Sequence, residues 1–137
     1  MPRLESRGRN RALQALYAWD VRGEEGLERV ALQVWDDLSV GPEERRIAGQ
    51  LVGVMIREGT EIDRLLSDVT TNWRLERLGA IERSVLRLAT AELTRGETPP
   101  KVVIQEAVRL AERYGSAQSA RFVNGRRTAA VREARRR

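Results

Sequence analysis

The 137-residue chain contains no cysteine and no histidine. The missing cysteine excludes a disulfide framework and thiol chemistry, and the missing histidine removes the commonest general base and the commonest zinc ligand. No apolar run approaches the roughly 18 residues that a membrane span needs, and the polar N-terminal residues lack the apolar core of a secretion signal. The sequence therefore predicts one domain with no metal, no cofactor and no membrane contact.

Lysine and aromatic residues are also scarce. Lys101 is the only lysine among 25 basic residues, and aromatic residues make up 4% of the chain. Arginine presents a planar fork that binds phosphates and stacks on bases, which favours an RNA partner. A bias this complete also follows from GC-rich codon usage, so it is weak support for RNA binding.

The positive charge is concentrated at the two ends of the chain. Residues 1–11 carry a net charge of +3 and residues 121–137 carry +6, whereas the residues between them carry −4. Segregated charge of this kind favours an anionic partner that the termini reach. A solvated basic tail explains the same pattern at least equally well.

Apolar residues recur at the helical period in the first half of the chain. The spacing predicts a helix over about residues 7–22 and a second helix over residues 27–38. A third helix is predicted to begin at Gly41-Pro42, since proline suits a first helical turn. Gly53 and Gly59 lie inside this third helix, and each weakens it by about 1 kcal/mol relative to alanine. Because glycine is small, these two positions suggest that another helix approaches closely there.

The second half of the chain has the same helical character. It predicts a short turn around residues 73–78 and a helix over residues 81–93 closed by Gly96. A further helix is predicted from Pro99 to Tyr114, with Gly115 as its C′ residue, and a last segment from near Ser119. No alternation typical of strands occurs. The predicted fold is therefore all-α, with six to seven helices in one domain whose two helical halves span about residues 1–68 and 72–137.

The stretch Arg121–Gly125 is the most informative part of the sequence. An exposed aromatic ring beside an arginine can stack on an unpaired base and bind its phosphate, which is the role that we predict for Phe122 and Arg121. The alternative is that Phe122 anchors the last helix in the core. After Gly125 the sequence is rich in arginine and offers few apolar residues, so this segment is predicted to bury little surface.

Four blocks of the chain together resemble the NusB family of bacterial transcription antitermination factors. They are Arg7-x-Arg9 followed by Ala12–Tyr17, Asn72-Trp73 with Leu78–Leu93, Pro99–Val108 running on to Tyr114-Gly115, and Phe122–Gly125. Each block is moderately specific by itself. The four occur in the family's order and at similar spacing, and they cover most of the chain.

The resemblance implies a fold of two packed helical bundles and no enzyme activity. It implies binding of single-stranded boxA RNA, found in the leaders of ribosomal RNA, together with an S-ten-type ribosomal protein. This assembly would join the elongating RNA polymerase complex with other Nus factors and suppress termination in the cytoplasm. Some members of the family form homodimers that cover the RNA surface, so a homodimer stays open.

The resemblance also implies which residues contact RNA. The family's RNA surface corresponds here to Arg7, Arg9, Tyr17, Arg83, Arg87, Arg121 and Phe122. Arg83 and Arg87 share one helix face because they are four residues apart. Two alternatives stay open from the residues alone: Tyr17 as a half-buried core residue, and ion pairing of the two arginines with Glu82 or Glu92.

Three other functions fit parts of the sequence. A helical module related to the N-terminal domain of ribosomal RNA cytosine methyltransferases is one, but the 137 residues contain no glycine-rich methyl-donor loop and no cysteine nucleophile. A DNA-binding regulator is another, but Glu43 and Glu44 would open its recognition helix and repel phosphate. The third is a helical homodimer that acts through protein contacts of the acidic middle region.

Overall fold

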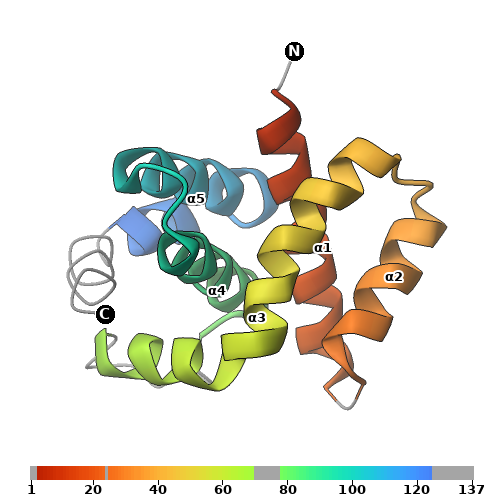
Figure 1. Ribbon diagram of the computed structural model, residues 1–137. Helices are drawn as coiled ribbons and strands as arrows, with labels where there is room; N and C mark the ends of the chain where they lie inside the picture. Colours follow the sequence, from red (N-terminus) through yellow and green to blue (C-terminus); the bar gives the residue numbers. More distant parts are fainter. Residues whose placement is uncertain (1–2, 24, 70–77, 125–137) are drawn as a thin grey trace.

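Helix α1 (Leu4–Arg22) lies at the centre of the structure, where it contacts α2, α3 and α4. The computed structural model describes residues 3–23, 25–69 and 78–124. The other helices are α2 (Leu27–Asp37), α3 (Pro42–Val69), α4 (Ala80–Arg95) and α5 (Pro100–Tyr114), followed by a helical segment over residues 117–124 (Figure 1). The described residues contain no strand, so the all-α prediction is confirmed.

The core forms because α1 buries more than one of its faces. Its fully buried side chains include Ala12, Leu13, Ala15 and Leu16, which the helical period of the sequence places toward neighbours on both sides. Helix α2 is fixed to α1 by the indole Nε1 of Trp35, which donates a hydrogen bond of 3.0 Å to a backbone carbonyl of α1. The amphipathic helices α4 and α5 cover another side of α1 (Figure 1).

A close approach between two helices occurs at Gly8 and not at Gly53 or Gly59 of α3. A Cβ at Gly8 would lie 2.3 Å from Cγ2 of Ile47, so only glycine fits where α1 crosses α3. Within 4 Å, Cβ atoms at Gly53 and Gly59 would meet only the side chains of Arg57 and Met55, from α3 itself. The expectation of a close helix approach at those two positions is therefore wrong.

The two predicted glycine ends differ in their backbone conformation. Gly96 ends α4 in the left-handed region, with φ 76° and ψ 9°, as expected. Gly115 ends α5 at the predicted position, but its φ of −110° and ψ of −107° are not left-handed. Glycine is needed there for space, because a Cβ would lie 2.7 Å from Oγ of Ser119 and 2.8 Å from the carbonyl oxygen of Ala111.

Several predictions fall on parts of the chain that the structure does not describe. Trp73 and the predicted turn around it lie outside the described residues, as does the arginine-rich segment after Gly125. The division into halves at about residues 68–72 stays a prediction. Within the described ranges, no helix has the length and apolar character needed to cross a membrane.

Candidate nucleic-acid interface

Arg9 belongs to a buried ion-pair cluster between α1, α4 and α5. Its Nη2 and Nε lie 2.7 and 2.8 Å from the carboxylate oxygens of Glu92, and its Nη1 lies 2.8 Å from Oε1 of Glu106. The Arg9 side chain is 8% exposed. Burial alone would lower the pKa of Arg9, but the hydrogen bonds and charges of the two glutamates raise it overall.

Arg83 and Arg87 meet a single carboxylate, that of Asp20 at the end of α1. Nε and Nη2 of Arg83 bind the two oxygens of Asp20 at 2.8 and 2.5 Å, and Nη1 of Arg87 lies 2.8 Å from Oδ1. Burial raises the pKa of the Asp20 carboxyl, but the hydrogen bonds and charges of the two arginines lower it overall. The cluster therefore joins α1 to the first half of α4.

Arg87 has a second carboxylate partner on α3. Its Nε and Nη2 lie 2.9 and 3.0 Å from the oxygens of Asp63, and its guanidinium lies 5.1 Å from the ring centre of Trp19. The alternative that the sequence left open, ion pairing of these two arginines, is therefore seen with other carboxylates than Glu82 and Glu92. Their carboxylate partners come from α1 and α3, because the shared arginine face of α4 points into the protein.

The other predicted RNA contacts are more accessible. Tyr17 is 41% exposed, which places its ring at the surface and contradicts a core position. Arg121 is exposed, and Phe122 is partly buried against the core. The side chain of Arg7 is 40% exposed and lies 3.7 Å from the carboxylate of Glu44.

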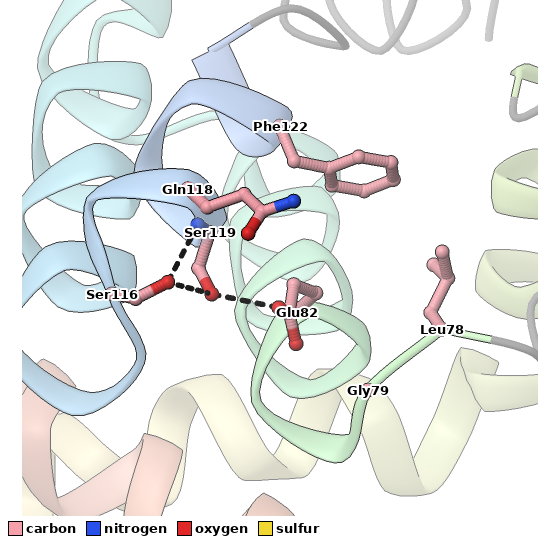
Figure 2. A pocket seen from close by; sticks show the side chains of 7 residues that line it. All are labelled: Leu78, Gly79, Glu82, Ser116, Gln118, Ser119 and Phe122. Atoms are coloured by element: carbon pink, nitrogen blue, oxygen red, sulfur yellow. Dashed lines mark hydrogen bonds between the residues drawn. The ribbon is translucent and has the colours of Figure 1, made fainter.

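Phe122 lines a pocket of about 250 Å³ beside the first turn of α4. The seven lining residues come from the entry to α4 and from residues 116–122: Leu78, Gly79, Glu82, Ser116, Gln118, Ser119 and Phe122 (Figure 2). Figure 2 shows Phe122 and Leu78 extending into the same space, with the Glu82 carboxylate on the opposite side. Apolar walls combined with hydrogen-bonding groups are what an unstacked base requires.

Hydrogen bonds fix the polar wall of this pocket. Oγ of Ser119 donates to Oε1 of Glu82 at 2.7 Å, and Oγ of Ser116 accepts from the backbone N–H of Ser119 at 3.1 Å. Ser116 thereby caps the helical segment 117–124, which begins earlier than predicted. The Glu82–Ser119 bond connects α4 to this segment and so connects the two walls of the pocket.

A second hollow, of about 270 Å³, lies on the other side of the same turn of α4. It is lined by Leu13, Gln14, Tyr17, Ile81 and Tyr114. Ile81 and Glu82 are consecutive residues, and each lines one of the two hollows. Tyr17 and Phe122 are therefore brought to the same end of α4 although they are more than 100 positions apart in the sequence.

The sequence did not identify the polar members of the site. Glu82 and Ser119 were not predicted as site residues, and neither were the carboxylates of Asp20 and Asp63. The serine at position 116 could have been found, since a serine before an apolar helical run is a common cap. In the described part of the chain, no group of three or more acidic, histidine or cysteine side chains could hold a metal ion.

Comparison with known proteins agrees with the fold. Residues 6–125 match the model of the NusB family, and the chain belongs to that family. The transcription antitermination protein NusB of Anaeromyxobacter dehalogenans is 44% identical over 123 residues, covering 88% of this chain and 84% of that protein. The NusB protein of Sorangium cellulosum is 41% identical over 121 residues, covering 88% and 86%.

Solved structures give the same result. The chain superimposes on T. maritima NusB with a TM-score of 0.86 and 32% identity, covering 97% of this chain and 94% of the other. A structure of the antitermination factors NusB and NusE in complex with double-stranded RNA has a TM-score of 0.84 and 30% identity, with coverage of 96% and 98%. The prediction that the chain is a NusB-type helical protein is confirmed.

Proposed function

We propose that this protein is a transcription antitermination factor that binds single-stranded boxA RNA together with an S-ten-type ribosomal protein. In this role it joins the elongating RNA polymerase with other Nus factors, works in the cytoplasm and acts by binding, without catalysis. Its NusB relatives support the proposal, and the solved complex of NusB, NusE and RNA supports an assembly of protein and RNA. A homodimer that covers the RNA surface stays a prediction.

The observation that carries the proposal is the pair of hollows on either side of the first turn of α4. One contains the exposed ring of Tyr17, and the other contains Phe122 next to the exposed Arg121. Aromatic rings offer stacking surfaces to bases, each worth about 1–3 kcal/mol, and arginine binds the connecting phosphates. We assign direct RNA contact to these three residues and to Arg7 in the basic N-terminal turn.

The remaining predicted arginines have a different role in this proposal. The guanidinium groups of Arg9, Arg83 and Arg87 are bound to carboxylates, and their side chains are at most 16% exposed. Moving one of them to a phosphate would take an ion-pair partner away from a buried carboxylate, which is costly. We therefore propose that these three arginines do not contact RNA but hold together the helices that carry the RNA surface.

The proposal is tested by fluorescence anisotropy with a labelled boxA-like strand and a scrambled strand, with and without the S-ten-type protein. We expect tighter binding to boxA, strengthened by the protein partner. With about four phosphates neutralised on a single strand, the slope of log affinity against log salt should be about −3. Equal, weak and salt-independent binding of both strands would contradict the proposal.

A matched pair of variants tests the surface itself. Arg121→Gln removes an exposed charge beside Phe122 and should weaken binding and reduce the salt slope by about 0.7. Arg46→Gln removes the same charge from the first turns of α3, where the side chain is 57% exposed and pairs weakly with Glu43. The control should leave the salt slope unchanged, and an equal effect of both variants would mean that only the net charge matters.

A further inference from the structure

The carboxylate of Asp20 is linked to the wall of the Phe122 pocket through one side chain, that of Arg83. The fork of Arg83 binds both oxygens of Asp20, at 2.8 and 2.5 Å. Its remaining nitrogen, Nη1, donates a hydrogen bond of 2.6 Å to the backbone carbonyl of Leu78. Leu78 and Gly79 lead into α4 and line the pocket, so the chain of contacts runs from the end of α1 to the pocket wall.

This link holds a segment that lacks a side-chain cap. The residue before α4, Gly79, makes no side-chain capping hydrogen bond, and it has no side chain to pack. Arg83 itself is well fixed: its side chain is 16% exposed, and that of Asp20 is 9% exposed. A planar guanidinium bound on one edge by a carboxylate has a defined orientation, so its other N–H groups point in a defined direction.

We propose that Asp20 is a positioning residue for RNA binding: by orienting Arg83, it holds the carbonyl of Leu78 so that the Leu78 side chain stays in place near Phe122. The inference rests on the proposed RNA-binding function of this surface. Asp20 itself does not reach the pocket, because it is not among the lining residues. A preformed pocket binds more tightly because less order is lost on binding.

The sign of the effect separates this role from simple electrostatics. RNA is a polyanion, so removing a negative charge from the protein should strengthen binding if charge alone matters. If Asp20 positions Arg83, Asp20→Asn should instead weaken RNA binding, because asparagine binds the Arg83 guanidinium less strongly. Asp63→Asn is the matched control, since it removes the same charge from the same cluster but contacts Arg87 and not Arg83.

The first measurement is RNA affinity of the full chain by anisotropy. Asp20→Asn should weaken binding about five- to tenfold, within the range that the loss of one stacked base produces, while the salt slope stays the same because no phosphate contact is lost. Asp63→Asn should bind equally well or slightly better. Equal or tighter binding by Asp20→Asn would overturn the proposal.

The second measurement does not depend on RNA. In the free protein, the amide resonance of Gly79 and the ring resonances of Phe122 should shift in Asp20→Asn and stay unchanged in Asp63→Asn. Arg83→Lys keeps the charge but loses the fork, so it should reproduce the shifts of Asp20→Asn, and it serves in its place should that variant fold poorly. Unchanged pocket resonances in both would overturn the proposal. If the wild type bound no RNA, both the proposed function and the expected effect of Asp20 on RNA affinity would be refuted. The resonance shifts would still decide whether Asp20 positions the pocket wall.

Discussion

Replacing Glu92 by glutamine would leave the charge of Arg9 partly uncompensated inside the protein. Glu92 is 6% exposed at its side chain and accepts hydrogen bonds from two nitrogens of Arg9 and from the hydroxyl of Thr98. A glutamine can accept from Arg9 with one oxygen, but its amide group would face the guanidinium donors. Removing one partner of a buried ion pair costs about 3–5 kcal/mol. Because Arg9 keeps its contact with Glu106, we expect a loss of about 3 kcal/mol for Glu92→Gln.

Urea denaturation followed by circular dichroism measures this loss. With a dependence of about 1–3 kcal/mol per molar urea, the midpoint should fall by about 1–3 M. The control is Glu43→Gln, which breaks a pair with Arg46 in which both side chains are more than half exposed; it should change stability by at most about 1 kcal/mol. Equal midpoints for the two variants would refute the reasoning.

A double variant separates the pairing from the burial. In Arg9→Met with Glu92→Leu both charges are removed, and such replacements are often neutral or stabilising. The Glu106 carboxylate would still accept hydrogen bonds from Arg109 and Ser6. We therefore expect the double variant to be more stable than Glu92→Gln. If the double variant were less stable than Glu92→Gln, the Arg9 and Glu92 side chains would stabilise the fold by more than the pairing of their charges.

Two further predictions concern packing and pH. Gly8→Ala should destabilise the protein by about 1–3 kcal/mol, because its Cβ would meet Ile47 at 2.3 Å. Gly49→Ala, whose Cβ would have nothing within 4 Å, should raise helix stability by up to about 1 kcal/mol. Thermal melting curves of the two variants that shift in the same direction would contradict this. The pKa values of Asp20 and Glu106 are lowered in the folded state. The stability that these carboxylates give the fold should therefore be complete above about pH 5 and be lost as the pH falls through the lowered values. A urea midpoint that rises on acidification would contradict the ion pairs.

The helices could be predicted from the sequence because each one carries an apolar stripe at the helical period. The predicted range of 27–38 agrees with α2 to within one residue, and Gly96 ends α4 as its position suggested. The close packing of α1 on α3 at Gly8 could not be predicted, since an isolated glycine near a helix start has no distinctive pattern. Space around a glycine depends on which helix crosses it, and periodicity does not contain that information.

The site was harder to predict for a related reason. Arginines that bind phosphate and arginines that bind a buried carboxylate have the same sequence pattern, as Arg83 and Arg87 show. Whether a residue is exposed is decided by the helix that packs against it, here α1 with its Asp20. The aromatic residues were more informative, because an aromatic ring that lies outside the core offers a stacking surface to a base.

The charges on α1 and α4 suggest how the sequence specifies the packing of these helices. Arg83 lies in the first turn of α4, and Glu92 and Asp20 lie in the last turns of α4 and α1. The helix dipole makes a positive charge unfavourable at the start of a helix and a negative charge unfavourable at its end, so all three charges are in unfavourable positions. Each instead faces an opposite charge on the other helix: Arg83 meets Asp20, and Glu92 meets Arg9.

These two contacts require α1 and α4 to run antiparallel, with the start of each beside the end of the other. A parallel arrangement would bring Arg9 toward Arg83 and Asp20 toward Glu92, and buried like charges are strongly unfavourable. Buried ion pairs add little net stability compared with apolar contacts, but they can select one register among several. The same pairs that fix this register also place the start of α4 between Tyr17 and Phe122, so the geometry of the proposed RNA surface follows from the charges that orient the core.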